Sequence, residues 1–425
     1  MSKYLITVTN AVLLNGGDAA IFYGIKEIIS RTNFSHANVV IRASQPELTQ
    51  RCFPSEKIRP LLSDVTYLWL PRRGRKLTRR LAFAVALILS DIYVRVTHQK
   101  IKACIEYAIP TIREYFESDF IISTGGTYLV PHYDIRHRLF EFAVINRLRK
   151  PFVLFAQSVG DLSTHPLGRL LARELSQASL IMLRDERSKS NVERLFALTG
   201  SQVPTVRIAD AAFALPSPPV APRRSRDAST RAPLRVAISV REWSHFRGQA
   251  EADTFERYKI AVAVTASWLV KEKRARITFI STCQGLYEYK RDELVAKSIV
   301  SNLHERVLRS IEVREDYRSV EEMRAEIADF DFCIATRMHM AILAIGVGTP
   351  VVPIAYEDKQ NDLFEDTPFS DLLVNYETVS FEHLAESCDQ ICSALTDWRQ
   401  RAEEMSARAR ADACTAVEHL ENALR

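Results

Sequence analysis

An arginine and a histidine interrupt an otherwise apolar stretch of this sequence. Residues 332–356 read FCIATRMHMAILAIGVGTPVVPIAY, and Arg337 and His339 stand between two apolar runs. The first run predicts a buried strand and the second a helix, so both side chains fall at a helix N-terminus. Unpaired backbone N–H groups and the helix dipole make that end positive, and further cations are unfavourable there unless an anion is bound. The pattern therefore predicts a pocket for a phosphate or a carboxylate.

A second arginine, Arg241, ends another predicted strand, RVAISVR. Because the carboxyl ends of parallel strands meet at one edge of a sheet, Arg241 and Arg337 could bind a single ligand. Two arginines can hold the phosphate and the carboxylate of one small dianion through bidentate hydrogen bonds. The plainer alternative is that Arg337 pairs with a carboxylate such as Asp329 or Asp331, and that His339 is an ordinary core residue.

Two glycine-containing turns follow predicted strands in the first half of the chain. In NAVLLNGGDAAIFYGI, Gly17 and Asp18 lie at the turn, but the G-x-G-x-x-G spacing of a dinucleotide site is absent. Asp18 could cap the helix, or it could bind or deprotonate a hydroxyl of an acceptor. In STGGTYLVPHYD, Gly125 and Gly126 allow a close approach of the backbone, and His132 follows them. This segment suits sugar recognition, and a plain loop is the alternative.

Short apolar segments alternate with amphipathic ones along most of the chain, which predicts parallel sheets covered by helices on both faces. We expect a first Rossmann-like domain over 1–214, a Pro- and Arg-rich linker over 215–233, a second Rossmann-like domain over 234–380, and two charged helices over 381–425. The fold class is therefore α/β, with two doubly wound domains facing a cleft. The predicted strands are 4–8, 39–43, 65–70, 120–123, 152–156, 180–183, 206–209, 235–240, 276–281, 311–313, 332–335, 351–355 and 372–374.

One segment, 71–105, does not fit this alternation and is expected to be an embellishment. Residues 71–80 hold six basic residues in ten, and the apolar run LAFAVALIL follows. Nine apolar residues are too few to span a bilayer but suit a helix that lies at its surface, which makes 71–96 a candidate membrane contact. The alternative is a core helix with a solvated basic start. A nucleic-acid partner is not expected, because aromatic residues do not interleave with these charges.

The composition indicates a globular protein, with 47% hydrophobic and 26% charged residues among 425. Seven scattered cysteines indicate reduced thiols in the cytosol. The N-terminus lacks the apolar core of a signal peptide, and no apolar run approaches the roughly 20 residues of a membrane span. We expect a cytoplasmic protein that could sit on the inner face of the membrane. Because no cluster has metal-ligand spacing, we expect no essential metal.

A set of short motifs resembles the polysaccharide pyruvyl transferase family over roughly residues 5–365. In chain order they are NGGD (15–18), TGG (124–126), FAQSVG (155–160), LRD (183–185), DAAF (210–213), ISVR (238–241), TRMH (336–339), GTPVVP (348–353) and AYEDK (355–359). The resemblance implies two Rossmann-like halves similar to the glycosyltransferase B architecture. It also implies transfer of pyruvate from phosphoenolpyruvate to two hydroxyls of one sugar, which forms a cyclic ketal.

The resemblance places phosphoenolpyruvate on Arg241, Arg337 and His339, with Lys359 near the same pocket. The two arginines would stabilise the departing phosphate, and our own hypothesis is that His339 delivers a proton as a general acid. The acceptor would be a saccharide, which could be lipid-linked, and no cofactor besides the donor is expected. Two alternatives stay open: a glycosyltransferase that uses a nucleotide-sugar, and an inactive scaffold in a polysaccharide-assembly complex.

Overall fold

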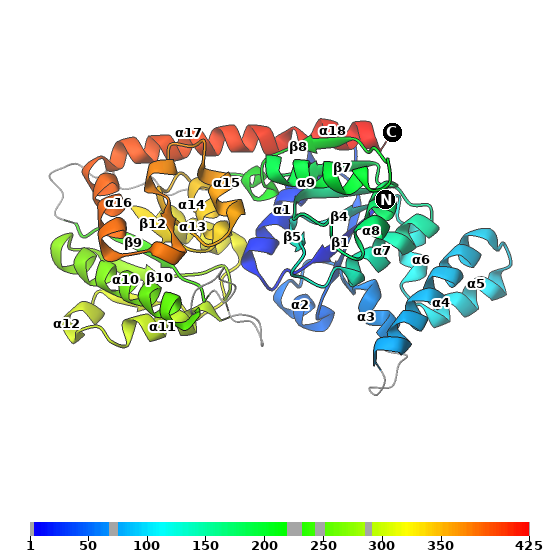
Figure 1. The fold of residues 1–425 in the computed structure, drawn as a ribbon, viewed down its shortest axis with the longest axis horizontal. Helices are drawn as coiled ribbons and strands as arrows, with labels where there is room; N and C mark the ends of the chain where they lie inside the picture. Colours follow the sequence, from blue (N-terminus) through cyan, green and yellow to red (C-terminus); the bar gives the residue numbers. More distant parts are fainter. Residues whose placement is uncertain (1–3, 68–74, 219–231, 243–250, 285–290, 425) are drawn as a thin grey trace. The chain divides into compact units, whose positions relative to one another are not determined.

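The computed structural model describes residues 4–67, 75–218, 232–242, 251–284 and 291–424 (Figure 1). By its internal contacts the chain divides into two compact units. Unit 1 comprises Met1–Leu13, Ile21–Ala211 and Asp412–Arg425, and unit 2 comprises Leu14–Ala20 and Ala212–Ala411. The short segment Leu14–Ala20 therefore packs with unit 2, although the strand before it belongs to unit 1.

Unit 1 contains a parallel sheet, whose strands in the described residues run in the order β3-β2-β1-β4-β6-β7-β8, with β5 paired to β6. The bounds are β1 Leu5–Ala11, β2 Asn38–Ala43, β3 Ile58–Pro60, β4 Phe120–Ser123, β5 Gly126–Leu129, β6 Phe152–Val159, β7 Leu180–Leu183 and β8 Thr205–Arg207. The central strands are buried along their whole length, as in β6, because helices cover both faces. This explains why they read as continuous apolar runs.

The helices of unit 1 follow the expected alternation. They are α1 Gly16–Ser30, α2 Pro46–Cys52, α3 Leu62–Tyr67, α4 Arg75–Arg95, α5 Gln99–Ala108, α6 Ile112–Glu117, α7 Arg136–Arg147, α8 Gly168–Leu175, α9 Glu186–Ala197 and α18 Ala416–Ala423. Helix α18 comes from the end of the chain and packs beside β7 (Figure 1). Helix α1 begins in the part of the chain that packs with unit 2.

Unit 2 contains a second parallel sheet, with the order β11-β10-β9-β12-β13-β14 in the described residues. Its strands are β9 Arg235–Ser239, β10 Arg276–Phe279, β11 Ile311–Val313, β12 Phe332–Ala335, β13 Val351–Ala355 and β14 Val374–Asn375. Its α-helices are α10 Glu251–Glu272, α11 Asp292–Val300, α12 Glu305–Leu308, α13 Val320–Ala328, α14 Met338–Gly346, α15 Asp358–Phe364, α16 Phe381–Ser393 and α17 Leu395–Cys414, of which α17 extends into unit 1.

The α/β class and the two parallel sheets confirm the predicted alternation, with a few local differences. The predicted strand 65–70 is wrong where the structure describes it, because α3 extends to Tyr67 and packs against α4 and α7; residues 68–70 lie outside the described residues. Strands β3 (IRP) and β5 (GTYL) were missed because neither forms an apolar run. Most of the predicted linker, 219–231, lies outside the described residues. The end of the chain forms three helices rather than two.

Candidate functional site

The carboxyl edge of the unit 2 sheet brings Arg241 and Arg337 to neighbouring strand ends. Strands β9 and β12 pair in parallel, with Ser239 opposite Ala335, so each arginine follows this matched pair by two positions. Tyr258 from α10 joins the two ends. Its hydroxyl accepts from the backbone N–H of Arg241 (3.3 Å) and is 2.8 Å from the hydroxyl oxygen of Thr336.

Arg337 lies just before α14 and is buried against a carboxylate. Its Nε donates to Oδ2 of Asp292 at 2.7 Å, and Nη2 donates to Oδ1 of the same side chain. Both side chains are almost fully buried. Burial alone would lower the pKa of Arg337, but the Asp292 carboxylate more than offsets this and raises the pKa above its ordinary value. The guanidinium is therefore held in one orientation, with Nη1 outside these two bonds.

Arg337 thus does pair with a carboxylate, as the alternative stated, but the carboxylate is neither Asp329 nor Asp331. Asp329 and Asp331 precede β12 and lie at the opposite edge of the sheet from Arg337, where they pair with Arg235 (3.4 Å) and Arg399 (2.8 Å), respectively. Asp292, the first residue of α11, is 45 positions away from Arg337 in the sequence. No local pattern connects two residues at such a separation.

Arg241 contacts aromatic side chains. Its Nη1 donates to the hydroxyl of Tyr356, and its guanidinium carbon lies 4.4 Å from the centre of that ring. The backbone carbonyl of Arg241 accepts from the hydroxyl of Tyr376 at 3.3 Å, and the Tyr376 ring stacks on Tyr258 at 4.3 Å. Burial raises the pKa of Tyr356, so its phenol is neutral near pH 7. The contact with Tyr356 therefore orients Arg241 without cancelling its charge.

His339 packs against the Gly17 turn, which belongs to unit 2 by its contacts. A Cβ atom on Gly17 would lie 2.6 Å from Nδ1 of His339, so only glycine leaves room for the imidazole. The side chain of Asn15 fixes the turn: Oδ1 accepts from the Gly17 N–H (3.0 Å), and Nδ2 donates to Oδ2 of Asp18 (2.7 Å). Asn15 therefore caps α1, and Asp18 lies in its first turn.

Lys359 is the second residue of α15, the helix that follows β13, and forms an ion pair with Glu357. Gln360 ties this turn to the end of β12. Its Nε2 donates to the carbonyl of Thr336 at 2.9 Å, and its Oε1 accepts from the N–H of Tyr356 at 3.1 Å. The AYEDK segment is thus joined to the strand end that carries Arg337.

One buried thiol in this region was not identified from the sequence. The Sγ of Cys283 lies 3.8 Å from Oδ1 of Asn15, within hydrogen-bond range for sulfur. Burial raises the pKa of Cys283 to about 12, more than offsetting the opposite effect of Arg337. The thiol is therefore protonated near pH 7, which excludes a role for Cys283 as a resting thiolate nucleophile.

The site residues predicted in unit 1 are two glycines and a histidine. A Cβ atom on Gly125 would lie 2.8 Å from the carbonyl oxygen of Phe155, so this glycine lets the chain approach its own neighbouring strand, β6. Gly126 has φ 135°, a conformation that favours glycine. His132 is exposed, and its ring centre lies 4.5 Å from that of Tyr133. A close backbone approach at Gly125 and Gly126 is therefore explained within unit 1 itself.

The LRD and DAAF motifs form a buried polar cluster at the carboxyl edge of the unit 1 sheet. Arg184 pairs with Asp210 at 2.7 Å and donates to the hydroxyls of Ser158 (2.6 Å) and Thr127 (2.7 Å). Asp185 accepts from the backbone at the start of α9 and caps it. These contacts join the ends of neighbouring strands, and we assign them a structural role.

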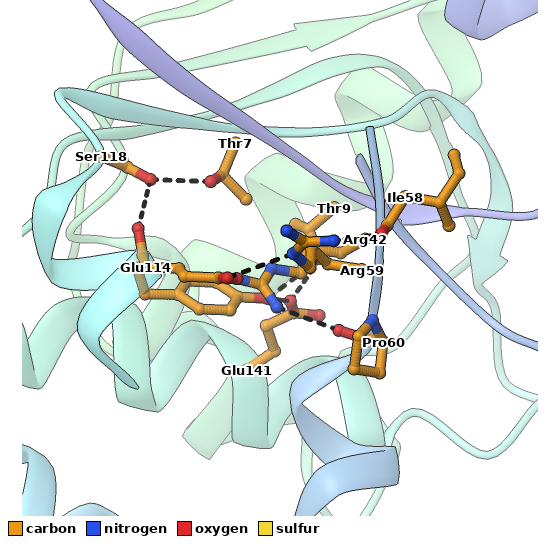
Figure 2. A network of polar contacts seen from close by, with 10 residues as sticks. Thr7, Thr9, Arg42, Ile58, Arg59, Pro60, Glu114, Ser118 and Glu141 are labelled. Atoms are coloured by element: carbon orange, nitrogen blue, oxygen red, sulfur yellow. Dashed lines mark hydrogen bonds and ion pairs between the residues drawn. The ribbon is translucent and has the colours of Figure 1, made fainter. Parts of the chain in front are cut away.

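A second buried network in unit 1 lies between β1, β2, α6 and α7 (Figure 2). Arg42 is fully buried, pairs with Glu114 and lies 4.7 Å from the ring centre of Tyr115. Glu141 accepts hydrogen bonds from the hydroxyls of Tyr115 and Thr9. Each of these charged groups has a hydrogen-bonding partner, so the network braces the sheet.

Comparisons with known proteins indicate the family and the fold of this chain. The polysaccharide pyruvyl transferase family matches residues 15–358. The amylovoran biosynthesis protein AmsJ of Erwinia amylovora is 24% identical over 377 residues, which cover 84% of each chain.

Several solved structures share the fold. Anabaena Alr3699/HepE in complex with UDP-glucose has 13% identity and a TM-score of 0.56, and trehalose-6-phosphate synthase OtsA has 12% identity and a TM-score of 0.57; each alignment covers 99% of both chains. These structures are glycosyltransferases of the B type, which confirms two Rossmann-like domains in this chain. The fold, the ordered motifs and the family match together establish that the chain is a transferase belonging to the polysaccharide pyruvyl transferase family.

Proposed function

We propose that the enzyme transfers pyruvate from phosphoenolpyruvate to two hydroxyls of one sugar, in a polysaccharide or a lipid-linked precursor, and forms a cyclic ketal. The observation that carries this proposal is the meeting of Arg241 and Arg337 at neighbouring strand ends, beside His339 in the first turn of α14. Phosphoenolpyruvate offers a phosphate and a carboxylate to such a pair of arginines. The general role in polysaccharide pyruvylation follows from the family and from the AmsJ relative.

Arg337 and Arg241 would have different roles in the reaction. Asp292 already balances the charge of Arg337 and holds its guanidinium in place. We assign Arg337 to orientation of the donor through Nη1, which takes no part in the Asp292 bonds. We assign Arg241, which the neutral Tyr356 phenol orients, to the charge that develops on the departing phosphate. Lys359 has Glu357 as its partner and would contribute less net charge.

The reaction must protonate one carbon and form two carbon–oxygen bonds. In the first step, His339 as an imidazolium would protonate the methylene carbon while a sugar hydroxyl attacks the adjacent carbon. In the second step, the carbon–oxygen bond to phosphate breaks and the second hydroxyl closes the ring. One hydroxyl proton restores the imidazolium, and the other leaves with the phosphate or enters solvent. Asp18, held by Asn15 in the same unit, is our candidate to accept this second proton before it leaves.

Recognition of the acceptor is assigned to Gly125, Gly126 and His132 of unit 1. The two glycines follow the carboxyl end of β4, and His132 is exposed further along the same segment. An imidazole can donate a hydrogen bond to, or accept one from, a sugar hydroxyl. The assignment predicts that His132 substitutions change the choice of glycoside more than the affinity for the donor.

Release of phosphate from phosphoenolpyruvate in the presence of a panel of glycosides tests the proposal. We expect release that depends on the glycoside, and a fall in kcat of about 10²–10⁴-fold for His339→Gln with little change in KM. His36→Gln, which changes an exposed histidine, is the matched control and should be unaffected. Release that no glycoside stimulates would contradict the proposal, and a His339→Gln enzyme with normal kcat and raised KM would reduce His339 to a binding residue.

A further inference from the structure

Exposed apolar side chains gather on one helical hairpin of unit 1, formed by α4 and α5. On α4, Val85, Ile88 and Ile92 are 45%, 59% and 36% exposed. Their spacing of three and four places them on one face of the helix. On α5, Ile101 and Tyr107 are 46% and 82% exposed. A row of exposed apolar side chains along one face of a helix is typical of a surface that binds a partner.

The opposite face of α4 holds the hairpin to the rest of unit 1. Ala86 and Tyr93 are buried, and Phe83 stacks on Phe140 of α7 with ring centres 3.9 Å apart. The hydroxyl of Tyr93 donates to Glu106 of α5 at 2.6 Å. One face of α4 therefore serves the core, while the stripe of Val85, Ile88 and Ile92 is not needed for it. The core-helix interpretation thus applies to one face of α4, and the membrane interpretation stays a prediction for the exposed stripe.

The charge of α4 indicates which class of partner its exposed apolar stripe would bind. Its sequence, RKLTRRLAFAVALILSDIYVR, contains five basic residues and one acidic residue, and four of the basic residues fall in its first six positions. The single acid, Asp91, pairs with Arg95 one turn later at 2.9 Å. Among the described residues, no helix is both long and apolar enough to cross a membrane. An apolar stripe on a basic helix that cannot span a bilayer is complementary to the surface of an anionic one.

We propose that the α4–α5 hairpin binds the surface of an anionic lipid bilayer, with Val85, Ile88 and Ile92 entering the boundary between headgroups and acyl chains. The sequence of α4 supplies the net positive charge that an anionic surface attracts. This inference goes beyond the proposed function, because it depends on neither the donor nor the ketal. It supplies a reason for the hairpin if the saccharide acceptor is carried on a lipid.

Co-sedimentation of the full chain with vesicles tests this inference. The vesicles contain phosphatidylcholine alone or phosphatidylcholine mixed with phosphatidylglycerol. We expect binding to the mixed vesicles that weakens with added salt. The triple variant Val85→Ser/Ile88→Ser/Ile92→Ser should lower the partition coefficient at least about tenfold, because each side chain loses apolar area that would enter the membrane.

The matched control removes exposed apolar side chains elsewhere. Ile260→Ser/Val264→Ser changes two exposed residues on α10 of unit 2 and should leave vesicle binding unchanged. The inference is overturned if the wild-type chain binds neither kind of vesicle, or if the triple variant and the control lose binding equally. It is also overturned if the wild-type chain is a dimer and the triple variant a monomer by light scattering, since the stripe would then serve a second copy of the chain. Circular dichroism checks that both variants are folded.

Discussion

Replacement of Asp292 by asparagine tests the balance of charge at the predicted donor site. The side chains of Arg337 and Asp292 are 9% and 3% exposed, and two hydrogen bonds join them. Removal of one partner from a buried ion pair leaves an uncompensated charge and typically costs 3–5 kcal/mol. Because asparagine keeps the shape and one acceptor, we expect a loss of about 3 kcal/mol, which is on the order of a hundredfold in the unfolding equilibrium.

Urea unfolding, followed by circular dichroism, measures this loss. The matched control is Glu305→Gln, which removes one carboxylate from the pair of Arg309 and Glu305, where both side chains are mostly exposed. An exposed pair contributes at most about 1 kcal/mol. If Asp292→Asn and Glu305→Gln destabilise the protein equally, Asp292 is not the buried counter-charge of Arg337.

The Asp292→Asn variant also tests whether phosphoenolpyruvate binds beside Arg337. With Asp292 neutralised, Arg337 offers a full positive charge, so phosphoenolpyruvate should raise the unfolding midpoint more in Asp292→Asn than in the wild type. Ligand at a hundred times its Kd adds about 2.7 kcal/mol of stability. An unchanged shift in the variant would show that the donor does not bind beside Arg337.

Two substitutions and one labelling experiment test the surroundings of the site. Gly17→Ala should lower kcat by about tenfold or more without unfolding the protein, because its Cβ would lie 2.6 Å from Nδ1 of His339 and displace the imidazole. Tyr258→Phe should raise KM for phosphoenolpyruvate and cost about 1–2 kcal/mol in urea unfolding, since it removes a buried hydroxyl that joins two strand ends. A thiol reagent near pH 8 should label the exposed Cys104 within minutes and the buried Cys283 only in denaturant, as mass spectrometry of digests would show.

Each of these experiments has a control, and one outcome would contradict its prediction. Gly346→Ala, at a position where a Cβ atom meets no other atom within 4 Å, should keep full activity. Tyr107→Phe, on an exposed tyrosine, should leave KM unchanged. Equal activities of the two glycine variants, equal KM values of the two tyrosine variants, or labelling of Cys283 as fast as Cys104 would contradict the structure at those positions.

Local patterns in the sequence predicted features that depend on residues close together in the chain, such as buried strands and the residues that follow them. Buried strands read as continuous apolar runs, and the residue that follows a parallel strand lies at its carboxyl edge. This reasoning placed Arg241 and Arg337 at one edge, and the pairing of Ser239 with Ala335 bears out that placement. The strand predicted at 65–70 was wrong over 65–67, which the structure describes, because a short apolar run does not distinguish a strand from a helix packed on its neighbours.

Contacts between residues far apart in the chain could not be predicted in this way. The partner of Arg337 is Asp292, on another helix, whereas the nearby acids Asp329 and Asp331 lie at the other edge of the sheet. The Gly17 turn packs against His339 within unit 2, although the sequence assigns the two residues to different halves. Such pairings follow from the tertiary fold, which periodicity alone does not specify.

Isothermal titration of phosphoenolpyruvate tests the donor site most directly. We expect the wild-type chain to bind phosphoenolpyruvate with a Kd of about 1 mM or tighter and to show no heat with UDP-glucose. Arg241→Ala should weaken binding of phosphoenolpyruvate about ten- to hundredfold. Arg235→Ala, which removes an arginine from the other end of the same strand, should leave binding unchanged. Binding of UDP-glucose in place of phosphoenolpyruvate, or equal effects of the two arginine variants, would contradict a phosphoenolpyruvate site at the carboxyl edge of unit 2.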